Sequence, residues 1–176
     1  MHIHIFGSSG SGVTSLGKAL GQTLQTPYFD TDDYYWEKTD PPFQVTTDIN
    51  ERKKKLLADL GTTDKWILGG SLGSWADFIK NDFDIAVYLW LPTDIREERL
   101  IKREKERGEG TLSKSSLDFI YWALAYDDNN REGRNKKRHE EWMSTLKCPL
   151  VRIETDISVQ DKIKTILLQL EKIKKS

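Results

Sequence analysis

Residues 7–14 of the chain read Gly7-Ser8-Ser9-Gly10-Ser11-Gly12-Val13-Thr14. This stretch fits the spacing of a phosphate-binding loop, G-x-x-x-x-G-K-[ST], at every defined position except residue 13, where valine replaces lysine. Its glycines permit backbone angles that let consecutive N–H groups point at an anion. The N-terminus of a following helix would add the positive end of its dipole. The alternative is a glycine-rich turn that only joins a strand to a helix.

The loop predicts a site for the phosphates of ATP and for Mg²⁺. Thr14 stands where a hydroxyl ligand to the metal belongs in such loops. The residues that we expect to bind the nucleotide are Gly7, Ser8, Ser9, Gly10, Ser11, Gly12, Val13, Thr14 and Ser15.

Val13 leaves the loop without the cation that would reach the β- and γ-phosphates. Lys18 is a poor substitute, because five helical residues carry it about 7.5 Å along the axis and roughly 140° around it. Loss of such an electrostatic donor weakens transition-state stabilisation by about 3 kcal/mol. Either another cation takes over, or catalysis is weak.

Strand-like runs and helical patterns alternate on both sides of the loop. The runs typical of strands are residues 2–6, 27–29, 65–68, 84–91 and 149–153, and the helical patterns cover 14–24, 48–60, 94–106 and 158–173. The alternation predicts an α/β fold with a parallel sheet and helices on both faces, in one domain over residues 1–176. Thr47 or Asp48 and, further on, Thr93 are the expected helix caps, and the Pro41-Pro42 pair predicts a loop.

Four unusual segments each follow a predicted strand. They are residues 7–13, 30–33, 69–71 and 92–94. Ligands of parallel sheets bind beyond the carboxyl ends of the strands. We therefore expect these segments to gather at one edge of the sheet.

The composition excludes several classes of protein. Charged residues make up 31% of the chain and hydrophobic residues 37%, with a formal net charge of −1. These values indicate a globular protein and argue against nucleic acid as the main partner. There is no run of about 20 apolar residues and no secretory leader pattern, and the one cysteine, Cys148, fits a reducing compartment. We expect a cytoplasmic protein that does not enter the membrane.

With the loop in place, the chain resembles the adenylate-kinase-like P-loop kinases, the group that includes shikimate and gluconate kinases. It also resembles a bacterial adenylate-kinase-like group in which the patterns GSGVT, FDTDDYYW and GRxxxRHxxW occur together. The resemblance implies a three-layer P-loop NTPase fold with a lid segment, here about residues 104–138. It also implies ATP, Mg²⁺ and transfer of the γ-phosphoryl group to a small molecule.

An Asp-x-Asp pair follows the second strand in shikimate-kinase-like members, and Asp30-Thr31-Asp32 is similar to it. The resemblance gives Asp30 to the metal and gives Asp32 to the acceptor hydroxyl, as a proton acceptor or orienting group. The alternative is a solvated acidic turn.

The resemblance also assigns the binding of the acceptor. Gly69-Gly70-Ser71, after the third strand, is similar to the glycine-rich turn that contacts the acceptor in the family. Arg52 is the positional match to an arginine that binds the acceptor's anionic group. A charge run on a helix, such as residues 52–55, is more often a solvated face.

Basic residues cluster around the expected lid. From these clusters we select Arg99, Arg103, Arg134 and Arg138 as candidate catalytic residues that bind the transferring phosphate. The arginine fork binds phosphate oxygens in pairs and keeps its charge.

These features favour a kinase that uses ATP and a small-molecule acceptor, either a nucleoside monophosphate or a hydroxyl-bearing metabolite. The alternative is a catalytically weak nucleotide-binding switch or pseudokinase, because Val13 replaces the loop lysine. A nucleic-acid-binding protein is a distant third interpretation, since the chain is nearly neutral and carries no known reader motif. The sequence leaves the oligomeric state open.

Overall fold

The computed structural model describes residues 1–39 and 43–175, so the loop predicted at Pro41-Pro42 lies outside the described residues. Five strands form the sheet: β1 (His2–Gly7), β2 (Tyr28–Asp30), β3 (Trp66–Gly69), β4 (Ile85–Leu89) and β5 (Leu150–Ile153). Their order is β2-β3-β1-β4-β5, and all four neighbouring pairs are parallel. The predicted α/β fold with a parallel sheet is confirmed.

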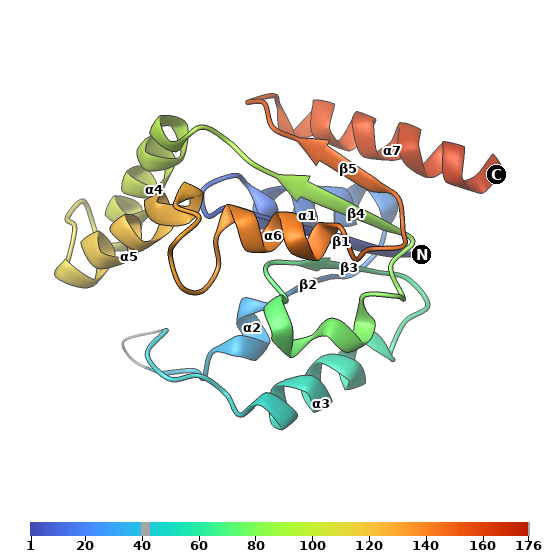
Figure 1. Ribbon diagram of the computed structural model, residues 1–176, viewed down its shortest axis with the longest axis horizontal. Helices are drawn as coiled ribbons and strands as arrows, with labels where there is room; N and C mark the ends of the chain where they lie inside the picture. The colour runs from blue at the N-terminus through green and yellow to red at the C-terminus, as the bar shows by residue number, and fades with distance from the viewer. Residues whose placement is uncertain (40–42, 176) are drawn as a thin grey trace.

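Helices cover both faces of this sheet (Figure 1). They are α1 (Val13–Leu24), α2 (Asp32–Tyr35), α3 (Ile49–Leu60), α4 (Thr93–Arg107), α5 (Lys114–Leu124), α6 (Lys136–Met143) and α7 (Val159–Lys175). Short 3₁₀ turns occur at Gly73–Trp75, Asp77–Ile79 and Ala125–Asp127. In the view of Figure 1, α6 crosses in front of the sheet, while α4 and α5 lie together at its left end. In the described part of the chain, no helix has both the length and the apolar character that crossing a bilayer would need.

Alternation along the strands divides the core into two layers. Ile3 and Ile5 of β1 pack with side chains of α1 and α7, such as Leu16 and Ile166. Phe6 points to the other face, where residues of β4 and α6 cover it. Because both faces are buried, β3 and β4 consist of apolar and aromatic residues with one glycine, while β1 also carries His2 and His4.

The helix starts follow local sequence, with one correction. Asp48 caps α3, since its carboxylate accepts hydrogen bonds from the N–H groups of Asn50 (2.9 Å) and Glu51 (3.2 Å). The predicted cap at Thr93 is wrong, because α4 begins at Thr93 itself and follows Pro92 without a side-chain cap. The Thr93 hydroxyl instead donates to Asp127 and accepts a hydrogen bond from Arg96.

The predicted gathering of loops at the carboxyl edge is confirmed. The N–H of Ser8 donates to the Leu89 carbonyl at the end of β4. At the neighbouring strand end, Gly70 has a φ of +104°, and a Cβ there would lie 1.9 Å from the Thr31 hydroxyl. Only glycine allows this approach, so the turn after β2 rests directly on the turn after β3.

Candidate functional site

The loop at residues 7–12 ends on a helix N-terminus that no side chain of the described residues caps. Gly12 is the N-cap with a φ of +98°, and the first turn of α1 holds no acidic residue. Within the loop, the Ser11 hydroxyl donates to the Ser8 carbonyl at 2.7 Å. The uncapped N–H groups and the helix dipole are therefore available to an anion, as the motif requires.

Val13, at the position of the usual loop lysine, packs against the apolar core. Its half-buried side chain packs against the core cluster that contains Leu16 and Leu20. The position that normally carries the phosphate-binding cation is thus part of the apolar core.

Thr14 and Asp30 lie side by side at the start of α1 and the end of β2. The Thr14 hydroxyl donates to Asp30 Oδ2 at 3.1 Å, and the Tyr28 hydroxyl donates to the same oxygen at 2.9 Å. A hydroxyl and a carboxylate are oxygen ligands that Mg²⁺ accepts when water and phosphate complete its shell. Among the described residues no three His, Cys, Asp or Glu side chains form a metal cage. Thr14 and Asp30 would therefore share the ion with the nucleotide.

Asp32 has different surroundings, although it is only two residues from Asp30. The walls of the site partly desolvate its carboxylate, and this desolvation, followed by the charge of Asp30, raises its pKa. The positive charges of Arg134 and Arg103 act in the opposite direction. A carboxylate between these influences is suited to exchange a proton with a hydroxyl group.

Arg134 reaches the phosphate loop from the segment between α5 and α6. Its guanidinium donates to the Ser9 hydroxyl at 2.6 Å, and its Cζ lies 4.9 Å from the centre of the Trp122 ring. Arg131 lies against the same ring, at 4.8 Å. Trp122 therefore packs against two basic residues of the predicted lid, of which Arg134 contacts the loop.

The other candidate arginines occupy different places. Arg99 pairs with Asp156 at 2.6 Å. Arg103 lies 5.1 Å from the ring centre of Phe119 and close enough to Asp32 to affect its pKa. The Arg138 side chain is exposed, and its guanidinium has no acceptor among the described residues.

The predicted acceptor-binding residues lie on the α3 side of the site. Arg52 is 7% exposed, with its guanidinium 4.0 Å from the Tyr35 ring centre and 5.3 Å from that of Trp75. One of its nitrogens donates to the Thr47 carbonyl at 2.6 Å, while its Nε is buried without a partner.

Gly69, the last residue of β3, must also be glycine, because the Tyr28 side chain lies close to its backbone. A Cβ on Gly69 would lie 2.2 Å from the Tyr28 hydroxyl. Beyond it, the Ser71 hydroxyl lies 3.3 Å from His139 Nε2.

Sequence reasoning missed a buried hydrogen-bonded chain behind the site. His139 Nδ1 is 2.6 Å from the Tyr126 hydroxyl, which is 2.9 Å from the Tyr88 hydroxyl. Burial, reinforced by the charge of Arg134, lowers the pKa of His139 to about 3, so its ring is neutral. The chain links α6 to Ser71 and to β4. The sequence did carry a signal for this chain, because His139 stands at helical spacing from the apolar residues Trp142 and Met143.

Two further charged residues at core positions were also missed. Arg96 is fully buried in α4, and Lys162 is 4% exposed in α7. Lys162 lies on the same helix face as Ile166 and Leu170. A lysine at a position where the helical spacing places apolar residues could therefore have indicated a buried lysine.

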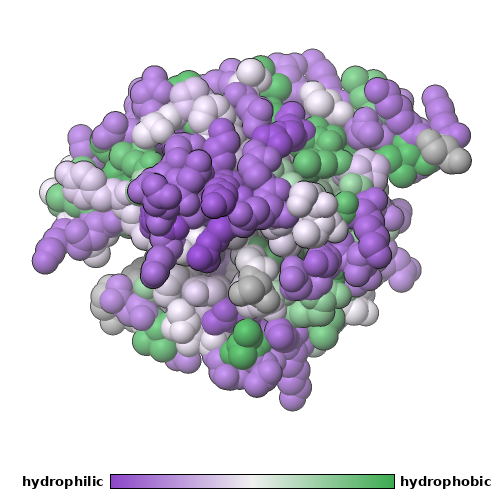
Figure 2. All heavy atoms as spheres, in the orientation of Figure 1, coloured by the Kyte–Doolittle hydropathy of each residue, from purple (hydrophilic) through white to green (hydrophobic). Residues whose placement is uncertain are grey.

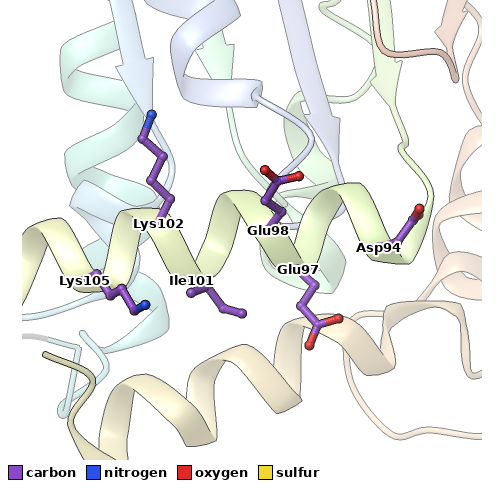
Figure 3. A pocket seen from close by; sticks show the side chains of 6 residues that line it. All are labelled: Asp94, Glu97, Glu98, Ile101, Lys102 and Lys105. Carbon is purple, nitrogen blue, oxygen red and sulfur yellow. The ribbon is translucent and has the colours of Figure 1, made fainter. Parts of the chain in front are cut away.

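The surface agrees with this placement of the site. Figure 2 shows hydrophilic side chains gathered over α6 and the segment before it, above a hollow that separates them from α2 and α3. A separate open hollow on α4 is drawn in Figure 3. The residues that line it are Asp94, Glu97, Glu98, Ile101, Lys102 and Lys105. None of them belongs to the phosphate loop or to the acidic turn, so that hollow is not the site described above.

The fold and the loop define the class of the protein: it has the P-loop kinase fold. Shikimate kinase from Acinetobacter baumannii in complex with shikimate superposes with a TM-score of 0.58 at 18% identity, over 97% of this chain and 93% of that one. Deoxyadenosine kinase from M. mycoides with bound dATP gives a TM-score of 0.58 at 17% identity, over 97% and 99% of the two chains. At these identities the likeness shows the fold.

Sequence comparison defines the family more narrowly. No family model matches the chain. "Uncharacterized protein YqaC" of Bacillus subtilis (strain 168) is 41% identical over 172 residues, which cover 94% of this chain and 95% of that protein. The chain belongs to the YqaC family.

Proposed function

We propose that this protein is a kinase that binds ATP with Mg²⁺ and transfers the γ-phosphoryl group to a small molecule. The observation that carries the proposal is the hydrogen bond between Arg134 and Ser9, at 2.6 Å, which spans 125 residues of sequence. It brings a basic residue of the predicted lid onto an uncapped phosphate loop, beside Asp32. A protein that only holds nucleotide has no need of this arrangement.

The residues of the chain divide the reaction between them. With a hydroxyl-bearing acceptor, Asp32 accepts the hydroxyl proton as that oxygen attacks the γ-phosphorus. A nucleoside monophosphate would attack with a phosphate oxygen, and Asp32 would then only orient it. The bond between the γ-phosphorus and the oxygen bridging to the β-phosphate breaks, and ADP leaves with that oxygen. Arg134 and Arg103 stabilise the negative charge on the transferring group. Mg²⁺, when held by Thr14 and Asp30, would neutralise charge on the phosphates.

The acceptor binds on the side of Arg52 and the turn Gly69-Gly70-Ser71. Arg52, held against the Tyr35 and Trp75 rings, would provide positive charge on the side where an anionic group of the acceptor binds. Shikimate and dATP are ligands of the structural neighbours. We therefore propose either a hydroxyl-bearing metabolite with an anionic group or a nucleoside monophosphate.

One observation favours a second candidate, a nucleotide-binding switch without turnover. Val13 is packed in the core, so the loop lacks its usual cation. Such a protein would bind ATP and release no ADP with any acceptor.

One experiment tests the proposal and separates the two candidates. ADP release from Mg-ATP is measured with a panel that contains shikimate, gluconate, deoxynucleosides and nucleoside monophosphates, and ATP binding is measured by calorimetry. A kinase gives ADP release that depends on one class of acceptor and disappears in Asp32→Asn. Binding of ATP without acceptor-dependent release would select the switch, and absence of ATP binding would contradict both.

A further inference from the structure

Lys162 is a buried lysine on the first turns of α7, beside the phosphate loop. Its side chain and backbone together are 4% exposed. A Cβ built on Gly12 would have one neighbour within 4.0 Å, the ammonium nitrogen of Lys162. The charge therefore faces the loop residue that precedes Val13, from a helix about 150 residues further along the chain.

No acid neutralises this ammonium. Among the described residues, no carboxylate lies within ion-pair distance of Lys162, and its ammonium donates no hydrogen bond. Asp156, whose charge acts on Lys162, is paired with Arg99 at 2.6 Å. Burial and the charge of Arg99 lower the pKa of Lys162, so its surroundings disfavour the positive charge when no anion is bound.

A purely structural role does not account for a lysine at this position. The other fully inward residues of α7, Ile166 and Leu170, are apolar and pack in the core. A methionine would fill the same volume without placing a partly desolvated, unpaired charge beside the loop. A partly desolvated, unpaired ammonium gains most from an anion that binds beside it.

We propose that Lys162 supplies the cation that the phosphate loop lost with lysine at position 13. It contacts the phosphates of the bound nucleotide from the α7 side, next to Gly12. The cation is thus relocated from the loop to the last helix, while residue 13 joins the core as valine. This inference rests on the proposed nucleotide site and names a further residue of it.

The test compares two lysines of the same helix. Lys162→Met removes the ammonium and keeps the stem of the side chain, and Lys162→Arg keeps the charge. Lys164→Met is the matched control, because Lys164 has a side chain that is 74% exposed and pairs with Asp161 at 3.2 Å. Calorimetry measures the binding of Mg-ATP, tripolyphosphate and adenosine, and thermal unfolding of each unliganded protein measures stability.

The expected result is a selective loss of phosphate binding. Lys162→Met should weaken ATP and tripolyphosphate about 10- to 100-fold, the range for one hydrogen bond to a charged group. Adenosine binding should change less than about threefold. The unliganded Lys162→Met protein should melt at the wild-type temperature or above it, because an unpaired buried charge is gone. Lys164→Met should bind ATP within about threefold of wild type, and Lys162→Arg, which keeps the charge, should retain more of the affinity than Lys162→Met.

Three outcomes would overturn the inference. If Lys162→Met binds ATP with wild-type affinity, the ammonium does not contact the phosphates. The proposed nucleotide site would stand in that case, because ATP still binds. An equal loss for ATP and adenosine, together with a lower melting temperature, would assign Lys162 to the fold. Failure of the wild-type protein to bind ATP or tripolyphosphate would overturn the proposed nucleotide site and the role of Lys162 together.

Discussion

Asp30 and Asp32 differ in what holds each carboxylate. Asp30 accepts hydrogen bonds from the Thr14 and Tyr28 hydroxyls and from the N–H of Asp32, all within 3.1 Å. Asp32 instead faces the charges of Arg134 and Arg103. We interpret Asp30 as a carboxylate held in place to bind the metal, and Asp32 as a carboxylate that can exchange a proton with the acceptor.

This division predicts different effects of two amide substitutions. Asp32→Asn should lower turnover at least about 100-fold and leave ATP affinity nearly unchanged, because an amide does not accept the hydroxyl proton. Asp30→Asn should weaken Mg-ATP binding, since the metal loses its carboxylate. Calorimetry and steady-state rates measure both effects. An equal loss of ATP affinity in the two variants would contradict the division.

The sequence predicts those residues whose roles follow from local spacing. The glycines of the loop and Thr14 were predicted in this way, and the roles of Asp30 and Asp32 were predicted from the family resemblance. Arg96 and Lys162 were not, because a charged residue on a helix reads as solvated unless its tertiary neighbours are known. The correction at Thr93 has the same cause, since its hydroxyl is engaged by Asp127 from a distant segment.

At the scale of the elements, the segment from α5 to α6 brings Arg134 to the phosphate loop. We predict that Arg134→Ala lowers turnover about 10³-fold, the effect of an arginine at a transferring phosphate. Of the four arginines, Arg134 is the one that hydrogen-bonds the loop. Arg99→Ala, Arg103→Ala and Arg138→Ala are the comparison variants. Val13→Lys should raise turnover little if other cations already neutralise the phosphate site.

A flat response to all four arginine changes, with clear wild-type activity, would contradict this account of the lid. If Val13→Lys raises a near-zero activity or tightens ATP, the protein is a lapsed enzyme rather than one in which other cations have compensated.

Arg96 joins α4 to the end of α5. Its guanidinium donates to the carbonyls of Leu91 (2.9 Å) and Ala123 (3.0 Å), and it pairs with Asp127. This anchor fixes the base of the segment that carries Trp122 and Arg134.

Removal of the anchor should destabilise the fold. Arg96→Met should lower the free energy of unfolding by about 3 kcal/mol, because Asp127 and two carbonyls lose their partner. The control Arg99→Met removes an ion pair of the same helix whose two side chains are 39% and 40% exposed, and it should change the free energy of unfolding by less than about 1 kcal/mol. Urea unfolding measures both values. Equal stability of the two variants would contradict the structural role of Arg96.

For the molecule as a whole, the sheet with its covering helices is the part most fully predicted from sequence. The apolar run of β4 and the helical spacing of α1 and α7 are properties of neighbouring residues, so their patterns sufficed. The arrangement of α5, the 3₁₀ turn and α6 depends on long-range contacts such as Arg134 with Ser9 and Trp142 with Asp77. Spacing along the chain carries no information about such pairs.

Two neutral histidines buried around the sheet make stability depend on pH. Burial lowers the pKa of His4 and of His139 to about 3. In the unfolded chain both titrate near pH 6.5. Their contribution to stability is therefore complete above about pH 6.5 and falls as the pH drops below it, by about 1.4 kcal/mol per unit for each ring.

His4→Phe should halve this slope. A phenylalanine can stack on Phe6 and Phe83 as the histidine ring does, at centroid distances of 5.0 Å and 4.9 Å, and it does not titrate. Urea unfolding between pH 7 and 5 measures the slope, and His2→Phe, at a half-buried ring stacked on Trp66, is the control. An unchanged slope in His4→Phe would show that the buried ring does not set it.

The central claim is that residues 7–14 bind the phosphates of a nucleotide, and calorimetric titration of Mg-ATP tests it most directly. The comparison is between Gly12→Asp and Gly110→Asp, since both glycines have left-handed backbone, with φ of +98° and +93°, but only Gly12 lies in the loop. An aspartate at residue 12 would place its carboxylate among the inward N–H groups and against the Lys162 ammonium. The account predicts one saturable ATP site in the wild type and in Gly110→Asp, and affinity at least about 100-fold weaker in Gly12→Asp. Equal ATP affinity in the three proteins, or no binding in the wild type, would contradict it.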